Sequence, residues 1–263
     1  MPAATQPAVP RPSASAVILR DNPAGIEIFM VVRHHEIDFA SGAIVFPGGK
    51  LDPQDSAPDW AGLVSGTAPA PERAYYVAAA RETFEEAGLL IARRHDGAAL
   101  LAAEEAHRLV ETRRASVAAG ETTFASLLSA ERLTLALDLM VPFAHFITPE
   151  ALPKRYETHF FLVAAPVAQL GLHDGHESVE GLWIRPGRAL EEARAGARTI
   201  VPATQLILER LAAHGTVADA VAATRATPVV SILPKVVRTE TGRKVVIPPG
   251  LGYATTEIAL PGR

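Results

Sequence analysis

The hydrophobic positions of the first fifty residues fall in short runs, bounded by turn residues, that predict β-strands. Residues 15–20 and 25–33 are such runs, and Asp21, Asn22 and Pro23 separate them, which predicts a hairpin or two neighbouring strands. Residues 43–49 form a third apolar run that ends in a Pro-Gly-Gly turn. The chain therefore begins with strands, ahead of any helical pattern.

Helical periodicity begins at about Pro71 and continues to Ala87, where Gly88 is the natural end of the helix. Before it, residues 51–71 are rich in Pro, Ser, Gly, Asp and Ala, which predicts a long loop. Residues 100–118 and 124–132 also carry a helical pattern.

In the second half, the pattern predicts strands around 140–147, 156–165 and 181–185, and short helices near 189–195 and 203–214. Residues 231–249 predict an extended hairpin that turns at Thr241 and Gly242. Strands, helix, strands and helix in this order favour an α+β sandwich. We expect a disordered leader (1–13) and a main domain (14–224) with an inserted loop (52–71) and a helical insertion (about 98–132). A C-terminal hairpin arm (225–263) would follow.

Composition narrows the functional classes. The 263 residues are 48% hydrophobic, which is ample for a core, and contain no cysteine, which excludes disulfides and thiolate metal sites. A net charge of −4 without a basic stripe argues against nucleic-acid binding, and no apolar run is long enough for a membrane span. With no hydrophobic signal core near the N-terminus, we expect a cytoplasmic protein with a small-molecule partner. A homodimer is left open.

Three carboxylates gather where the helix of residues 71–87 should least favour them. Glu82, Glu85 and Glu86 lie in its last turns, near the negative end of the helix dipole, and their i, i+3, i+4 spacing puts them on one face. Arg81 is spaced to pair with only one of them, Glu85. A solvated charged face is the plain alternative, but a set of hard oxygen ligands suits Mg²⁺ or Mn²⁺. A bound cation would relieve the repulsion.

At these residues the chain resembles the Nudix hydrolases, whose signature reads G-x5-E-x7-R-E-U-x-E-E-x-G-U, with U a bulky apolar residue. Gly49 matches the first glycine, and residues 81–89 match the helical half. Asp55 stands where the first Glu belongs, and 25 residues separate it from Arg81 instead of seven, which is an insertion of 18 residues. Thr83 fills a position that is more often aliphatic.

The departures, together with residues 46–60, 153–162 and 177–186, are similar to the Nudix branch that hydrolyses coenzyme A and acyl-CoA. The resemblance covers roughly residues 13–211. The last three residues, Pro-Gly-Arg, are not a peroxisomal targeting tripeptide, so a bacterial cytoplasmic relative is the better match.

The resemblance implies an α/β/α sandwich and Mg²⁺-dependent hydrolysis of a diphosphate bond in a nucleoside-diphosphate-linked substrate. By position, the metal ligands would be Glu82, Glu85, Glu86 and the Gly48 carbonyl, and Arg81 would hold Glu85 in place. The cation would neutralise the diphosphate and acidify the attacking water.

A separate carboxylate would act as general base. The resemblance favours Glu177, in a polar loop before a strand, and then Glu180; if neither serves, Glu82 remains. Solvent-exposed loop acids are the plain alternative.

Five further residues are candidates for substrate binding. Arg33 and His34 end the strand before the signature, Lys50 lies within it, and Arg155 and His159 belong to a later strand. Alternation would put Arg155 and His159 on one side of that strand, toward the substrate. A surface role or a buried polar strand face is the alternative for each.

The same residues are compatible with two other functions. A pyrophosphatase acting on ADP-ribose, NADH or a dinucleoside polyphosphate would use the same signature. A non-catalytic Nudix-fold sensor would be expected to lack the carboxylates and to carry a DNA-binding segment. This sequence keeps the carboxylates and shows no basic recognition helix. The inserted loop (52–71) is expected to border the substrate site as an excursion that can be shortened without loss of the fold.

Overall fold

The computed structural model describes residues 6–33, 42–66, 68, 70–169, 171, 178–240 and 242–260. Within these ranges no helix combines the length and the apolar character that a membrane crossing requires.

A central mixed sheet has the strand order β10-β2-β1-β9-β8-β11, with β3 paired to β2 and β4 paired to β1. Its strands are β1 (Arg11–Asn22), β2 (Gly25–Arg33), β3 (Ile44–Val45), β4 (Gly48–Lys50), β8 (Val141–Ile147), β9 (Tyr156–Ala164), β10 (Ser178–Ile184) and β11 (Ser231–Ile232). The predicted hairpin of residues 15–33 is confirmed, since β1 and β2 are antiparallel around Asn22 and Gly25.

Strand β1 organises the sheet. It runs parallel to β9 from Arg11 to Leu19, and near its start it also pairs with β4, which places Ser15 opposite Gly48. The strand begins three residues inside the segment 1–13 that was expected to be a disordered leader. Pairing with β9 supplies the backbone hydrogen bonds that a Pro/Ala-rich composition alone did not predict.

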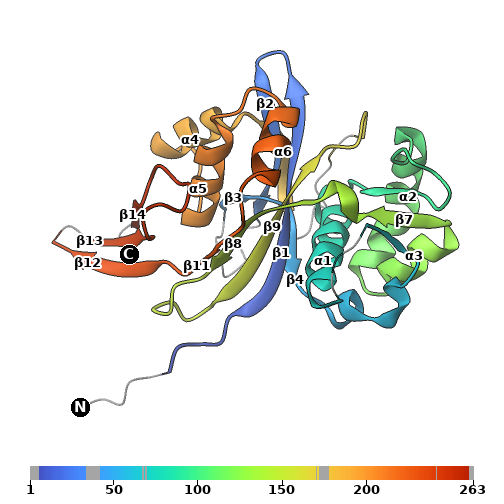
Figure 1. Cartoon of the computed structure of the whole chain (residues 1–263), viewed down its shortest axis with the longest axis horizontal. Coiled ribbons are helices and arrows are strands. Elements are labelled where there is room, and N and C mark those ends of the chain that lie inside the picture. Colours follow the sequence, from blue (N-terminus) through green and yellow to red (C-terminus); the bar gives the residue numbers. More distant parts are fainter. Residues whose placement is uncertain are drawn as a thin grey trace.

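Helices cover both faces of this sheet, so the predicted α+β class and α/β/α layering are confirmed (Figure 1). Helix α1 (Ala70–Ala87) packs on one face, where Ala16, Ile18 and Phe161 meet Val77 and Phe84. Helices α4 (Pro186–Arg194), α5 (Pro202–Leu211) and α6 (Val217–Arg225) cover the other face.

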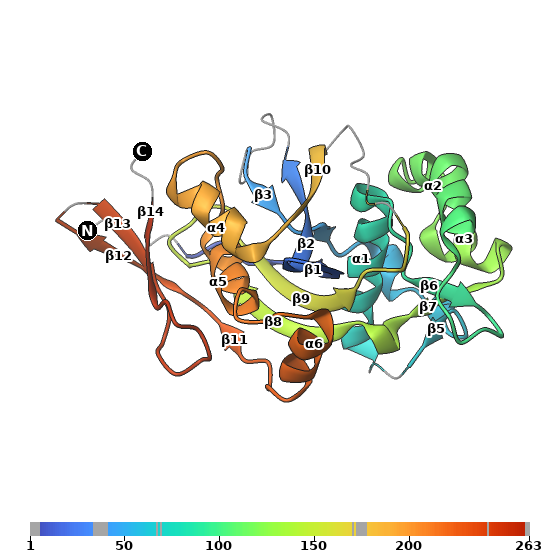
Figure 2. The same ribbon diagram turned by 90° about the horizontal axis from the view of Figure 1, so that it is seen from above.

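A lobe on the α1 side holds both insertions (Figure 2). It consists of the 3₁₀ turns η1 (Pro53–Ser56), η2 (Pro58–Trp60) and η3 (Leu137–Leu139), the strands β5 (Val64–Ser65), β6 (Ala92–Arg94) and β7 (Leu133–Ala136), and the helices α2 (Ala103–Ala118) and α3 (Phe124–Ala130). The strands form a separate sheet in the order β5-β7-β6. The helical predictions for residues 100–118 and 124–132 are confirmed.

Residues 51–66 are anchored by two buried side chains, those of Asp55 and Trp60, although many other residues of the segment are exposed. Trp60 is fully buried, its indole N–H donates to the Gln54 carbonyl, and its ring lies 6.2 Å from that of Phe124. The expectation that this segment is an excursion is therefore wrong for its described part. The polar composition of the segment did not predict this packing. A single buried tryptophan removes enough apolar surface from water to hold a short segment in place.

The C-terminal residues form an arm with one strand more than predicted. Strands β12 (Lys235–Thr239) and β13 (Gly242–Val246) make the expected hairpin, although Thr241 of its turn lies outside the described residues. Strand β14 (Glu257–Leu260) adds to β13. The short elements β6, β7, β14 and α6 were not predicted. For α6, the signal was Thr216, whose side chain caps the helix by accepting from the Asp219 N–H.

Candidate active site

The site is built around the C-terminal half of α1. The helix ends where the sequence predicted, since Gly88 adopts φ +61° and donates its N–H to the Phe84 carbonyl. From α2, Arg114 donates to the Glu85 carbonyl at 2.7 Å and helps to hold this end in place. Thr83, the atypical residue in the signature, is buried, and its hydroxyl donates a hydrogen bond to the Ala79 carbonyl one turn earlier. This bond satisfies the polar group at an otherwise apolar position.

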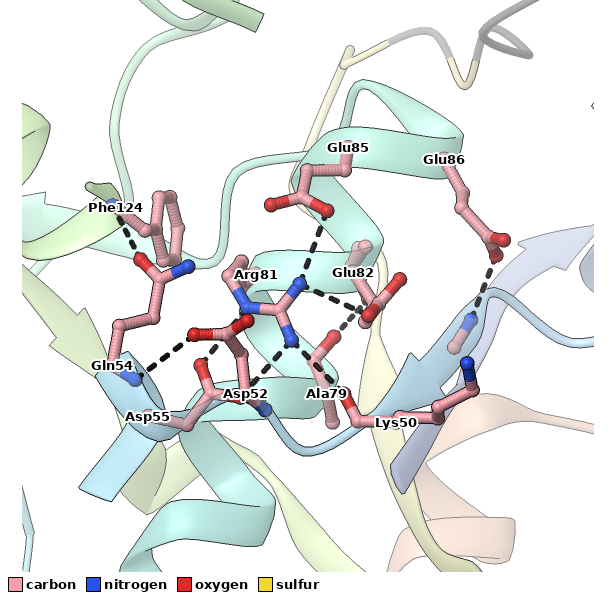
Figure 3. Close-up of polar contacts among 12 residues, drawn as sticks. Lys50, Asp52, Gln54, Asp55, Ala79, Arg81, Glu82, Glu85, Glu86 and Phe124 are labelled. Carbon is pink, nitrogen blue, oxygen red and sulfur yellow. Dashed lines mark hydrogen bonds and ion pairs between the residues drawn. The ribbon is translucent and has the colours of Figure 1, made fainter. Parts of the chain in front are cut away.

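Arg81 is the centre of the polar network and uses all five of its N–H donors (Figure 3). Nη1 donates to both Glu82 (2.9 Å) and Glu85 (3.1 Å), and Nη2 reaches the Lys50 carbonyl (3.1 Å). The expectation that Arg81 pairs with Glu85 alone was wrong, because a planar guanidinium serves neighbours on several sides at once. One arginine therefore partly relieves the repulsion within the glutamate cluster.

Asp55 completes this network from the inserted segment. Its carboxylate accepts from Nε (2.9 Å) and Nη2 (3.0 Å) of Arg81, and it also accepts from the Asp52 N–H at 2.8 Å. The side chain is fully buried. Despite the 18-residue insertion, the residue at the first acidic position of the signature meets the signature arginine.

The charges around Arg81 set its protonation. Burial lowers the pKa of the guanidinium, but the hydrogen bond to Asp55 and the charges of Glu82, Asp55 and Glu85 outweigh burial, so the net pKa is raised. Arg81 is thus a permanent cation that holds two of the glutamates in place.

Two glycines of the turn let the chain pass close to the glutamates. Gly48 donates its N–H to Glu86 Oε2 at 2.8 Å, and a Cβ on Gly48 would lie 2.2 Å from Ser15 Oγ. A Cβ on Gly49 would lie 2.3 Å from Glu82 Oε1. The two glycines are therefore needed because they lack side chains: Gly48 lets the turn lie close to β1, and Gly49 lets it lie close to Glu82.

A cavity of about 960 Å³ opens beside these groups. Glu82 and Glu85 lie in its wall with Gly48 and Gly49, while Glu86 is buried behind them against Gly48. The sequence prediction that the three glutamates converge at the Gly-Gly turn matches this geometry, and their role as metal ligands stays a prediction.

Of the residues predicted to bind substrate, Arg33 and Lys50 line the cavity. The Arg33 Nε is buried and has no hydrogen-bond partner in the described part of the chain, which leaves a donor for an anion. His34 and Glu177 lie outside the described residues, so both stay predictions. Glu180 is exposed on β10, does not line the cavity, and lies 3.5 Å from Arg198.

Arg155 and His159 lie away from the cavity. The Arg155 guanidinium donates to the carbonyls of Thr148 and Ala8, so it ties the N-terminal segment to the turn before β9. His159 points to the opposite face of β9, where its ring lies 4.0 Å from that of Tyr75 on α1. The prediction that Arg155 and His159 face the substrate was wrong. Alternation assigns residues to two faces of a strand but does not determine which face lines the cavity.

The other face of β9 supplies cavity residues that the sequence analysis missed, namely Tyr156, Thr158 and Phe160. Further apolar wall comes from Phe146, Leu206, Val245 and Leu260, which belong to β8, α5 and the C-terminal arm. Alternation along β9 was the one available signal, and nothing in the local sequence pointed to the arm.

Comparison with known proteins decides the family. The model of the NUDT19 Nudix domain matches residues 65–211, which is more than half of the chain. The chain belongs to this Nudix family.

Two relatives support the assignment. "Putative nudix hydrolase 7" of Caenorhabditis elegans is 27% identical over 202 residues, which are 76% of this chain and 60% of that protein. The chain thus spans about three fifths of the length of this relative. A crystal structure of a Nudix hydrolase from Alicyclobacillus acidocaldarius is 29% identical and has a TM-score of 0.65, covering 81% of this chain and 96% of the other.

The donor set of this Nudix site fits a hard divalent cation. Glu82, Glu85 and Glu86 offer carboxylate oxygens beside the Gly48 backbone, with no sulfur or imidazole among them. Mg²⁺ and Mn²⁺ prefer such oxygen ligands. The buried Arg33 donor in the same cavity suits an anionic group.

Proposed function

We propose that the protein hydrolyses the diphosphate bond of coenzyme A or an acyl-CoA, releasing 3′,5′-ADP and 4′-phosphopantetheine or its acylated form. The observation that carries the proposal is that one cavity joins the glutamate cluster to a long apolar wall. At about 960 Å³ the cavity is at the upper end of the range for small-molecule sites. A large substrate with an anionic part and an extended, less polar part matches such a cavity.

The polar side of the cavity is suited to the diphosphate. Arg33 and Lys50 line the same cavity as Glu82 and Glu85, so cationic donors and carboxylates border one space. A divalent cation held by the glutamates would neutralise the diphosphate and acidify the attacking water. Arg81 would keep Glu82 and Glu85 oriented through its hydrogen bonds.

The apolar side is suited to the pantetheine arm and an acyl chain. Phe146 and Phe160 come from the sheet, Leu206 from α5, and Val245 and Leu260 from the C-terminal arm. The arm lies beyond residues 65–211, which the family model matches. It therefore adds a wall to the site from outside the matched region.

Hydrolysis breaks one P–O bond of the diphosphate bridge and forms one P–O bond to water, whose proton passes to a base. We assign this base to Glu177. The neighbouring Ser178 pairs with Arg33, which lines the cavity. Glu180 is the weaker candidate, since it is exposed and close to Arg198.

A product screen tests the substrate. Purified protein with Mg²⁺ is incubated with CoA, short- and long-chain acyl-CoAs, ADP-ribose, NADH and a dinucleoside polyphosphate, and products are identified by mass. We expect 3′,5′-ADP from CoA substrates at the highest kcat/KM. If kcat/KM is higher for ADP-ribose or NADH than for the CoA substrates, the protein is a pyrophosphatase of dinucleotides or ADP-ribose and the CoA proposal is wrong. No turnover of any substrate, with binding retained, would favour the sensor.

A matched pair of arm variants tests the apolar wall. Leu260→Ser places a hydroxyl in the cavity, whereas Val237→Ser changes an exposed arm residue that does not line it. Removing part of an apolar contact costs on the order of 1–3 kcal/mol, or about 10-fold or more in discrimination. Leu260→Ser should lower kcat/KM for long-chain acyl-CoA relative to CoA, and Val237→Ser should not. If the ratio of kcat/KM for long-chain acyl-CoA to kcat/KM for CoA is the same in both variants, the arm does not bind the acyl chain.

A further inference from the structure

We propose that His145, Glu157 and His159 form a second cation site, suited to Zn²⁺ or a similar borderline metal ion and separate from the glutamate cluster. The three side chains lie on β8 and β9, on the sheet face that α1 covers. Their neighbours Thr158 and Phe160 point to the catalytic cavity on the other face. The proposal does not depend on which substrate is hydrolysed.

The spacing of the donor atoms is close to that of a metal site. One ligand atom from each residue lies within 4.8 Å of the other two, and His145 Nε2 lies 3.1 Å from Glu157 Oε1. Tetrahedral bonds of about 2.0–2.2 Å place ligand atoms roughly 3.3–3.6 Å apart. The His145–Glu157 pair already has nearly this separation. The His159 ring is stacked on that of His145, so it would have to rotate to direct a nitrogen to the same ion.

His145 is held as a metal-ligating histidine usually is. Its Nδ1 lies 2.7 Å from Ser231 Oγ on β11, which orients the ring. The side chain is only 10% exposed, and its buried Nε2 lies 3.1 Å from Glu157 Oε1 without the alignment of a regular hydrogen bond. If Nδ1 carries the proton and donates to Ser231, the Nε2 lone pair faces a carboxylate oxygen. A cation between these two atoms resolves that repulsion.

His159 is held in place beside the other two donors. Its ring packs against those of Tyr75 and His145, 4.0 Å from each ring centroid. The two nitrogens lie at the edge of the ring, which is the part of an imidazole that binds a metal ion.

The chemistry of the three donors separates this site from the glutamate cluster. Two imidazoles and one carboxylate are a set that Zn²⁺ binds with an open fourth position, whereas Mg²⁺ prefers oxygen alone. An ion here would join β8 to β9, and Ser231 would link it to β11. We therefore expect it to stabilise the sheet edge that leads into the C-terminal arm.

The test measures Zn²⁺ binding by titration calorimetry in excess Mg²⁺, with Co²⁺ absorption as a second readout of a tetrahedral site. Wild type should bind one Zn²⁺ and gain thermal stability. His145→Gln and His159→Gln should each weaken binding at least about tenfold, the scale known even for outer ligand partners. The matched control is His107→Gln, which changes an exposed histidine on α2 and should leave binding unchanged.

Two further variants keep the test decisive. Glu157→Gln removes a partly exposed ligand, so it should reduce Zn²⁺ affinity even if a buried histidine variant fails to fold. Glu86→Gln alters the glutamate cluster and should leave Zn²⁺ affinity intact. The proposal is overturned if wild type binds no Zn²⁺, if the histidine variants bind it as tightly as His107→Gln, or if Glu86→Gln alone abolishes binding. The first outcome would mean that a shared proton, rather than a metal, bridges His145 and Glu157.

Discussion

Arg81 and Asp55 lie 26 residues apart in the sequence and form a buried bidentate ion pair, with Nε–Oδ1 at 2.9 Å and Nη2–Oδ2 at 3.0 Å. The pair joins the inserted segment to the helix that carries the glutamates. Because the remaining donors of Arg81 hold Glu82 and Glu85, the position of both carboxylates depends on a residue in the insertion.

The first prediction concerns this pair. Asp55→Asn removes the fully buried counter-charge of Arg81 and leaves it only the partly buried Glu82 and Glu85, and breaking a buried pair costs roughly 3–5 kcal/mol. We expect the free energy of unfolding to fall by about that amount and kcat to fall with it. Urea denaturation and steady-state kinetics would measure both.

The control is Asp59→Asn, in the next 3₁₀ turn of the same segment, where the aspartate is exposed. It should change neither quantity appreciably. If Asp55→Asn changes the free energy of unfolding and kcat as little as Asp59→Asn does, the ion pair does not stabilise the protein and Arg81 is held by its other contacts.

The second prediction concerns the metal. Mg²⁺ or Mn²⁺ that binds only the folded state should raise Tm, and a chelator should reverse the rise. In Glu86→Gln, the amide oxygen can still accept from Gly48, so the fold is kept while one negative charge is lost. This variant should lose most of the Tm shift and of the activity.

Glu72→Gln, an exposed change in the first turn of the same helix, serves as the control and should keep both. Full turnover by Glu86→Gln would rule out Glu86 as a metal ligand.

The third prediction concerns the close approach at Gly49. A Cβ added there would lie 2.3 Å from Glu82 Oε1, so Gly49→Ala must displace the carboxylate or the turn. Misplacing a positioned group costs on the order of 10²-fold in kcat. Gly187→Ala is matched in chemistry and has no atom near the added methyl, so its kinetics should equal wild type. Wild-type kinetics for Gly49→Ala would show that the Glu82 position is not needed.

The fourth prediction concerns the general base. Glu177→Gln should lower kcat by about 10² or more while KM changes little, which is the usual scale for loss of such a group. Glu180→Gln should have a small effect, because Glu180 is exposed and does not line the cavity. The reverse pattern would exchange the two roles. If neither variant is impaired, Glu82 becomes the candidate base.

The fifth prediction concerns pH and the lobe beside α1. Burial raises the pKa of Asp138, but hydrogen bonds from Ser65 and Arg93 outweigh it, so the net pKa is lowered. A carboxylate with a lowered folded-state pKa stabilises the protein above its unfolded pKa of about 3.9, and this contribution is lost as pH falls through the folded value.

Asp138→Asn should therefore cost up to about 1 kcal/mol at pH 7, since the side chain is 38% exposed, and progressively less below pH 4. Urea midpoints at pH 7, 5 and 3 would measure the difference from wild type. Asp96→Asn, an exposed change in the turn after β6, is the control. A difference from wild type that stays constant down to pH 3 would contradict the assignment.

The sequence by itself determined the features that depend on neighbours along the chain. Helix α1 and its end at Gly88 follow from periodicity and from the freedom of glycine, and the spacing of Glu82, Glu85 and Glu86 puts them on one face of any helix. The hairpin β1–β2 follows in the same way from two apolar runs around a turn.

Only the tertiary structure decided which distant groups meet. Asp55 reaches Arg81 because Trp60 anchors the insertion in the core, and this contact spans a length of chain over which local patterns carry no information. Alternation along β9 separated Thr158 from His159, but only the packing of α1 on one face directed Thr158 toward the cavity and His159 away from it. The C-terminal arm likewise supplies Val245 and Leu260 to the cavity because the folded sheet brings chain segments together in space, whatever their separation in sequence.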